Sequence, residues 1–112
     1  MNINRSSMAS FGFSPPTRIF EVAGAGAPLL CDAWPGIEEV FEPADGPGQE
    51  ILIIHSAEDV VAALDRYPVE QRKQVGANAL ARALRDHTYA QRAHQAQGIF
   101  TELLAAREAT TV

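Results

Sequence analysis

The chain has little of several features that would direct a functional interpretation at once. Cys31 is its single cysteine, so an internal disulfide is excluded. Cys31 lies in a continuous apolar stretch, which favours a small packed side chain over a reactive thiol. Basic residues are also scarce, with nine Lys and Arg against fourteen Asp and Glu and a formal net charge of -5. Because a phosphate backbone attracts a basic surface, no nucleic acid is expected as a partner.

Membrane and metal features are missing as well. No apolar run approaches the ~20 residues that a membrane span requires, and the first residues lack the charged and apolar regions of a signal peptide. We therefore expect a cytoplasmic protein with no membrane span. His87 and His94 are separated by about two helical turns, which is too far for one ion to bridge. We therefore expect neither a metal nor another cofactor.

Short apolar runs alternate with helical patterns along the chain. Strands are predicted over 27–31 and 50–55, with residues 2–5 as the end of another strand. Helices are predicted over 15–23, 37–41, from Ser56 to Tyr67, over 69–84 and from 88 onward, and 42–49 is a loop. Strands joined through helices favour parallel pairing. We predict a single α/β domain, 1–112, with a partial Rossmann-like parallel sheet of about three strands, helices packed on it and long C-terminal helices.

Apolar spacing also predicts which helix faces are buried. The expected core stripes are Val60, Val61 and Leu64 in the helix after Ser56, and Val75, Ala79 and Ala83 in the next helix. Trp34 follows the strand over 27–31 and is interpreted as a half-buried aromatic at the sheet edge; the alternative is a side chain that flanks a base or a sugar.

The helix expected after Ser14 carries the most informative polar residues. Ser14 is a suitable N-cap, and Pro15 and Pro16 fall where proline is tolerated, in the first helical turn. A helix N-terminus attracts anions, and here the Thr17 hydroxyl and the Arg18 guanidinium stand beside its amides.

Glu21 belongs to the same face of this helix, because it follows Thr17 by four residues and Arg18 by three. One interpretation is a polar edge that faces a ligand. The alternative is an Arg18–Glu21 ion pair on a solvated helix face, worth only a few tenths of a kcal/mol.

Gly24 and Gly26 invite comparison with a dinucleotide-binding fingerprint. That fingerprint must follow a strand and open a helix, whereas these glycines close a helix and precede a strand. We interpret them as a C-cap with left-handed backbone geometry and a close approach of helix to strand.

Several segments together resemble one known family. They are Arg18-Ile19-Phe20-Glu21, Ala23-Gly24-Ala25-Gly26-Ala27, Leu29-Leu30-Cys31-Asp32, Pro35-Gly36-Ile37-Glu38, and Asp86-His87-Thr88-Tyr89 followed by Arg92-Ala93. In this order they resemble the nucleotide-sugar-binding domain of GT-B glycosyltransferases of group 1, in the form found in spore maturation protein CgeB-like enzymes. The resemblance covers nearly the whole chain.

The resemblance implies the donor-binding part of a glycosyltransferase, whose partner is a nucleotide-diphosphate sugar. Arg18 and Thr17 would contact the diphosphate, and Glu21 would accept hydrogen bonds from the ribose. The other implied substrate-binding residues are Gly12, Phe13 and Ser14 in the turn before the helix, and Asn4 and Arg5, for which a frayed terminus is the alternative. Many relatives place a glutamate that contacts the donor sugar where this chain has Phe13.

The resemblance also implies parts that this chain lacks. A complete domain of the family has about twice as many strands and is joined to an acceptor-binding domain, so we expect a missing N-terminal portion or acceptor domain. No catalytic residue is nominated, because such a group would come from the missing part. The alternative is a non-catalytic nucleotide-binding or self-assembling α/β module. A half sheet exposes an apolar edge, so we also expect a homo-oligomer. A phosphoacceptor receiver domain would need clustered acids at the end of the first strand, which are not present.

Overall fold

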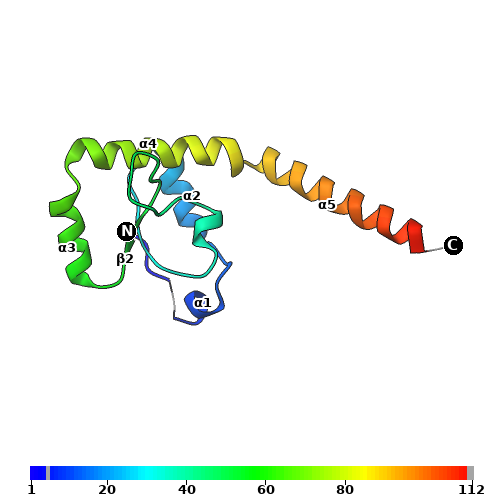
Figure 1. Ribbon diagram of the computed structural model, residues 1–112, viewed down its shortest axis with the longest axis horizontal. Helices are drawn as coiled ribbons and strands as arrows, with labels where there is room; N and C mark the ends of the chain where they lie inside the picture. Colours follow the sequence, from blue (N-terminus) through cyan, green and yellow to red (C-terminus); the bar gives the residue numbers. More distant parts are fainter. Residues whose placement is uncertain (5, 111–112) are drawn as a thin grey trace.

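A computed structural model describes residues 1–4 and 6–110. In chain order, the elements are α1 (Ser6–Phe11), α2 (Thr17–Gly24), β1 (Leu30–Asp32), the short 3-10 helix η1 (Ile37–Glu39), β2 (Leu52–Ile54), α3 (Ala57–Arg66), α4 (Val69–Asp86) and α5 (Tyr89–Thr110). Figure 1 shows the first seven elements gathered into one body, with α4 lying across it and α5 extending away. The molecule is therefore elongated, with extents of 63 × 29 × 21 Å.

The sheet has two parallel strands among the described residues, with Leu30 opposite Leu52 and Asp32 opposite Ile54. The predicted parallel α/β arrangement is confirmed, but the predicted count of about three strands is wrong. Asn2 forms a single parallel bridge with Cys31 on the other side of β1. The pairing stops there because the next backbone amide that faces β1, that of Asn4, donates to the side chain of Asp32 at 3.1 Å and not to a backbone carbonyl of β1.

α2 begins at Thr17, later than predicted, and its N-cap is Pro16 in an extended conformation (φ -69°, ψ 148°) with no side-chain cap bond. The prediction of Ser14 as the N-cap was therefore wrong. The reason lies in the two adjacent prolines: Pro16 disfavours helical geometry in Pro15, so the helix starts only after the pair. Gly12 and Phe13, both with positive φ (70° and 54°), make the turn that precedes α2.

The C-terminal end of α2 has the expected left-handed residue. Gly26 has φ 71°, and its amide donates to Ala23 O at 2.9 Å. This turn approaches α4 closely, whereas the sequence predicted a close approach to a strand. A Cβ atom placed on Gly76 of α4 would lie 2.3 Å from Gly26 O. Glycine at position 76 therefore lets the end of α2 lie directly on α4.

The main core lies between β1, α2, η1 and α4. Its buried members are Ile19, Ala23, Leu29, Cys31, Trp34, Ile37, Phe41, Ile51 and Ala79. Cys31 is buried as predicted, with none of its surface exposed. Trp34 is 4% exposed, so it is a core residue and not the half-buried edge residue that the sequence indicated.

The three C-terminal helices occur where predicted. Ser56 caps α3 as expected, and its Oγ accepts a hydrogen bond from the Asp59 amide at 3.2 Å. The predicted core stripe of α3 was wrong, because Val61 and Leu64 are 62% and 49% exposed and Val60 is half-buried. α3 packs against β2, the last strand, through Ala63 on a different face, so no sheet lies beneath Val61 and Leu64.

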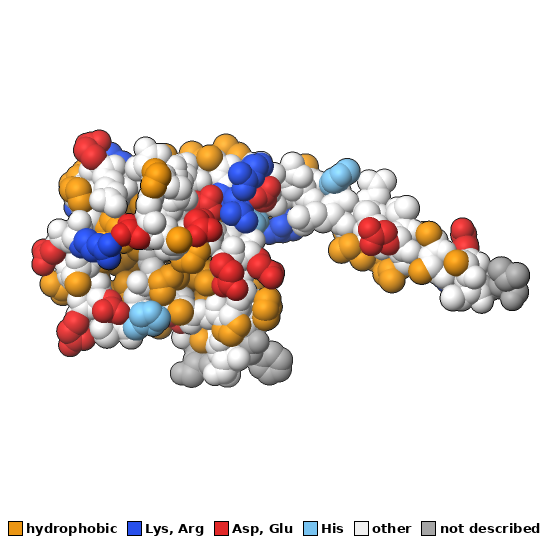
Figure 2. Space-filling model, in the orientation of Figure 1, with side chains coloured by type: hydrophobic (Ala, Val, Ile, Leu, Met, Phe, Trp, Pro, Cys, Tyr) orange, Lys and Arg blue, Asp and Glu red, His pale blue; other side chains and the backbone are white. Residues whose placement is uncertain are grey.

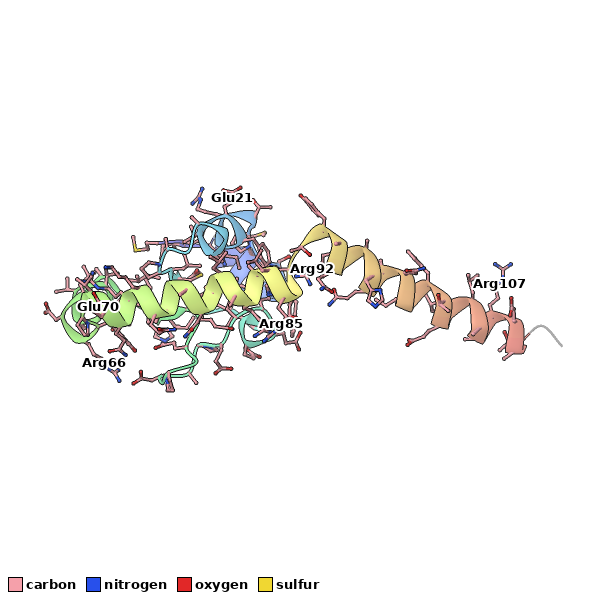
Figure 3. The ribbon with its side chains drawn as sticks, turned by 90° about the horizontal axis from the view of Figure 1, so that it is seen from above. Glu21, Arg66, Glu70, Arg85, Arg92 and Arg107 are labelled. Carbon is pink, nitrogen blue, oxygen red and sulfur yellow. The ribbon has the colours of Figure 1, made fainter. Side chains whose placement is uncertain are left out.

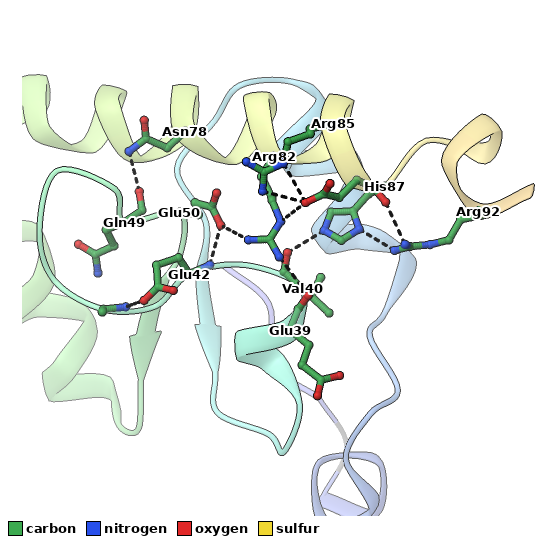
Figure 4. Close-up of polar contacts among 12 residues, drawn as sticks. Glu39, Val40, Glu42, Gln49, Glu50, Asn78, Arg82, Arg85, His87 and Arg92 are labelled. Carbon is green, nitrogen blue, oxygen red and sulfur yellow. Dashed lines mark hydrogen bonds and ion pairs between the residues drawn. The ribbon is translucent and has the colours of Figure 1, made fainter. Parts of the chain in front are cut away.

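The predicted stripe of α4 is confirmed, with Val75 and Ala79 buried and Ala83 partly buried. α4 also anchors the loop over 42–49 and the residues beside it. Asn78 Nδ2 donates to Pro47 O at 2.9 Å and to Gln49 O at 3.0 Å in the loop. Beside the loop, Arg82 forms an ion pair with Glu50 at 3.0 Å, and its Nη2 donates to Glu39 O at 3.1 Å (Figure 4).

α5 projects beyond the body and has no buried side chain. Its large apolar residues, Ile99, Phe100, Leu103 and Leu104, are between 57% and 63% exposed, and Figure 2 shows orange side chains along the projecting helix. Over the described residues, no helix combines the length and the apolar character needed to span a membrane.

Candidate functional site

A cavity of about 490 Å³ lies at the N-terminal end of α2, and we call it the α2 cavity. Its lining consists of Asn2, Ile3, Asn4, Met8, Pro16, Thr17, Arg18 and Glu21. Four of the residues singled out from the sequence are therefore brought together: Asn4, Thr17, Arg18 and Glu21. Figure 3 shows Glu21 on the outward side of α2, away from α4.

The polar edge of α2 is open to a ligand. Among the described residues, no ion pair joins Arg18 to Glu21, so the alternative of a paired, solvated helix face is not supported. Ile19 N donates to Pro16 O at 3.3 Å, whereas the amides of Thr17 and Arg18 have no partner in the part of the chain that the structure describes. These two amides and the Arg18 guanidinium give this end of the cavity a positive character.

The opposite wall of the α2 cavity is held by the N-terminal segment. Asn2 is 3% exposed, and its Nδ2 donates to Asn4 Oδ1 at 3.2 Å. The Asn4 amide is in turn held by Asp32 at the end of β1. Asn2 was not selected from the sequence as a site residue. Its spacing of two from Asn4, which puts both side chains on one face of an extended segment, is the signal that could have found it.

The predicted turn residues lie outside the lining of the α2 cavity. Gly12 is buried against the loop after β1, where an added Cβ would come within 2.6 Å of Pro35. Phe13 is 67% exposed, and its ring covers Gly36. A Cβ atom added to Gly36 would lie 2.4 Å from the Phe13 ring. Ser14 is exposed on the segment that leads to α2, and Arg5 lies outside the described residues.

A second cavity, of about 710 Å³, lies between α2 and the connection of α4 to α5, and we call it the joint cavity. Its lining consists of Thr17, Phe20, Glu21, His87, Thr88, Tyr89 and Arg92. Thr17 and Glu21 line both cavities, so the two adjoin along one edge of α2. No binding role was predicted from the sequence for the lining residues that follow α4.

His87 lines the joint cavity, and its hydrogen-bond partners define its protonation state. Its Nε2 lies 2.7 Å from Val40 O, and its Nδ1 lies 2.6 Å from Nη2 of Arg92 (Figure 4). A carbonyl can only accept and a guanidinium can only donate, so the ring is neutral with its hydrogen on Nε2. Burial lowers the pKa of His87, and the positive charges of Arg92 and Arg82 act in the same direction.

A third cavity, of about 590 Å³, lies beyond the carboxyl ends of β1 and β2. Its lining consists of Met1, Ile3, Asp32, Ala33, Ile54, His55, Ser56, Ala57 and Val60. This end of a parallel sheet is a common ligand site, but its lining is mostly apolar and contains neither Lys nor Arg, so it is poorly suited to a diphosphate. Over the described residues, no three His, Cys, Asp or Glu side chains are grouped as a metal site would require.

Comparison with known families gives one match. The sequence model of a family described as glycosyl transferase-like matches residues 1–98. The chain belongs to that family. The matched range of this glycosyl transferase-like chain includes every residue of the α2 cavity and of the joint cavity. Membership supports a role in glycosyl transfer. No curated protein and no solved structure matches the chain.

Proposed function

We propose that this chain is the donor-binding part of a GT-B, CgeB-like glycosyltransferase, which transfers a sugar from a nucleotide-diphosphate sugar to an acceptor. The observation that carries the proposal is the joint presence of Thr17, Arg18 and Glu21 in the lining of one cavity, with Arg18 and Glu21 not paired to each other. Family membership makes a sugar nucleotide the natural ligand for that cavity.

Arg18 and the N-terminal amides of α2 are the groups that would bind the diphosphate. Departure of a nucleoside diphosphate leaves negative charge on its phosphate oxygens. Oriented N–H groups and a cation stabilise such charge as it develops, and they need no rearrangement when they are already in place. The amides of Thr17 and Arg18 are oriented by α2 and have no other partner among the described residues. The two prolines before them have no N–H, so these are the first two donors at this end of the helix.

Glu21 lies one helical turn further along α2 and supplies an acceptor. An ionised carboxylate accepts hydrogen bonds from hydroxyl groups, which suits the ribose of the donor. Asn4, on the opposite wall, offers its side-chain amide: Asn2 Nδ2 donates to its Oδ1, and its backbone N–H donates to Asp32. The proposed order along the cavity is therefore diphosphate at Arg18 and ribose at Glu21.

The test is a titration of the ¹⁵N-labelled chain with uridine, guanosine and adenosine diphosphates, followed by backbone amide shifts. We expect shifts concentrated between Thr17 and Glu21. Arg18→Ala should weaken binding by about 1–3 kcal/mol, because a charge-assisted hydrogen bond is lost. Arg66→Ala is the matched control, since Arg66 is an exposed arginine on α3 that pairs with Asp45.

Two outcomes would count against the proposal. One is the absence of any shift at millimolar concentrations of all three nucleotides. The other is equal weakening by Arg18→Ala and Arg66→Ala, which would mean that general charge and not the α2 cavity attracts the ligand.

A further inference from the structure

We propose that the joint cavity binds the base of the nucleotide and prefers a base with ring carbonyl oxygens, uracil or guanine, over adenine. This inference rests on the proposed function, because it places one end of the same donor. It concerns residues of α5 and of the connection between α4 and α5, which lie more than sixty positions after α2 in the sequence.

The order of the two cavities matches the order of groups in a nucleotide. Arg18 lines the α2 cavity, Glu21 lines both cavities, and Phe20 and Tyr89 line the joint cavity alone. A nucleotide is built in the order phosphate, ribose, base. If the phosphates lie at Arg18 and the ribose at Glu21, the next group along the molecule enters the joint cavity.

Aromatic side chains supply the surface that a base requires. The rings of Phe20 and His87 meet edge-on, with centroids 5.2 Å apart, and line the cavity together. Tyr89, on its rim, is 95% exposed, so both faces of its ring are free to stack on a planar group. Stacking on an aromatic side chain is a general way to bind nucleic-acid bases.

The polar groups of the joint cavity are mainly hydrogen-bond donors. Arg92 donates to Asp86 O, Gln95 Oε1 and His87 Nδ1, which fixes its guanidinium. These bonds use three of its five N–H groups and leave two without a partner among the described residues. Thr88 Oγ1 accepts from the Gln91 amide at 3.2 Å, so its own hydrogen also remains available. Donors of this kind suit carbonyl oxygens, which uracil and guanine present and adenine does not.

The experiment compares ligands that differ only in the base. Uridine monophosphate, adenosine monophosphate and ribose 5-phosphate are titrated into the labelled chain. We expect uridine monophosphate to bind more tightly than the other two and to shift the amides of residues 87–92. Tyr89→Ala should weaken the binding of uridine monophosphate on the order of 10-fold to 100-fold and leave the binding of ribose 5-phosphate unchanged, because only the stacked ring is lost.

Two further variants separate stacking from a general effect on α5. Tyr89→Trp should retain the affinity for uridine monophosphate. Phe100→Ala removes another exposed aromatic side chain of α5, outside the joint cavity, and should change nothing.

The two proposals fail in different ways. Equal affinity for uridine monophosphate and ribose 5-phosphate, or no effect of Tyr89→Ala, overturns the assignment of the joint cavity. The donor site itself still stands in that case if ribose 5-phosphate binding remains sensitive to Arg18→Ala. Adenosine monophosphate binding as tightly as uridine monophosphate overturns the preference for carbonyl-bearing bases. Failure of every ligand to bind overturns both proposals.

Discussion

His87 connects three parts of the molecule through a single neutral ring. It caps the C-terminal end of α4, contacts Val40 after η1 and receives a hydrogen bond from Arg92 of α5. Its ring also lies against Phe20 and Phe41, at 5.2 and 5.3 Å between centroids. A second proton would have to bind to Nδ1, which accepts the hydrogen bond from Arg92. That hydrogen bond would be lost, and the charged imidazolium would face the charged guanidinium.

We therefore expect an acid-dependent loss of stability that depends on His87. Burial lowers the pKa of His87 from its ordinary value of 6.5. The hydrogen bond to Val40 O and the charge of Asp86 oppose this shift, whereas the charges of Arg92 and Arg82 add to it. The unfolded chain then takes up the proton first as the pH falls. The contribution of the neutral ring is fully present above about pH 6.5 and is lost as the pH falls through the lower pKa of the folded state.

The measurement is the free energy of unfolding in urea between about pH 7 and 5, followed by the fluorescence of the buried Trp34. His87→Gln should flatten the decline with falling pH relative to the unmodified chain. His94→Gln, at an exposed position of α5, should leave the decline as it is. An unchanged pH profile in His87→Gln would contradict the proposed neutral ring.

The crossing of α2 and α4 is the main helix contact of the body, and it depends on Gly76. Glycine in the middle of a helix normally costs about 1 kcal/mol relative to alanine. Here the absence of a side chain on Gly76 allows Gly26 O to lie 2.3 Å from the position that a Cβ atom would occupy. The sequence predicted both helices and the left-handed turn at Gly26, but it could not predict which element that turn would meet, because contacts between distant segments leave no local pattern.

Gly76→Ala should destabilise the body despite the higher helix propensity of alanine. The added Cβ would lie 2.3 Å from a backbone oxygen, which cannot move without displacing the end of α2. We expect a net loss of roughly 1–3 kcal/mol in the free energy of unfolding.

Gly98→Ala in α5 is the matched control. Nothing lies within 4 Å of its added Cβ, so far-UV circular dichroism should show equal or greater helicity. Equal stability of Gly76→Ala and the unmodified chain would contradict the tight crossing.

The candidate site follows the same division between local and distant information. Helical spacing predicted Thr17, Arg18 and Glu21 on one face of a helix, and in the structure all three line the α2 cavity. The turn chemistry of Ser14 was misjudged because the effect of Pro16 on the residue before it outweighed the preference of serine for an N-cap. The joint cavity could not be predicted, since it forms where α2 meets a connection more than sixty residues later.

At the scale of the whole molecule, α5 is the part that the fold leaves without support. It is 22 residues long, has no buried side chain and contacts the body only near its connection to α4. Ile99, Phe100 and Leu103 repeat at helical spacing on one face and are more than half exposed. Such a face is costly to leave in water, so the homo-oligomer expected from the sequence stays a prediction, now with α5 as the surface that a second copy would cover.

Concentration should therefore change both the mass of the particle and the protection of α5. In a dilute solution of about 10 µM, amides of α5 should exchange with deuterium much faster than those around Val75 and Ala79 in α4, because most helical stability in proteins comes from tertiary packing, which α5 lacks. At tenfold higher concentration, sedimentation should show association, and exchange in α5 should slow. Leu103→Lys should abolish both effects, whereas Ala105→Lys, on the opposite side of α5, should abolish neither. A monomer whose α5 exchange is independent of concentration would show that this face is not covered by a second copy.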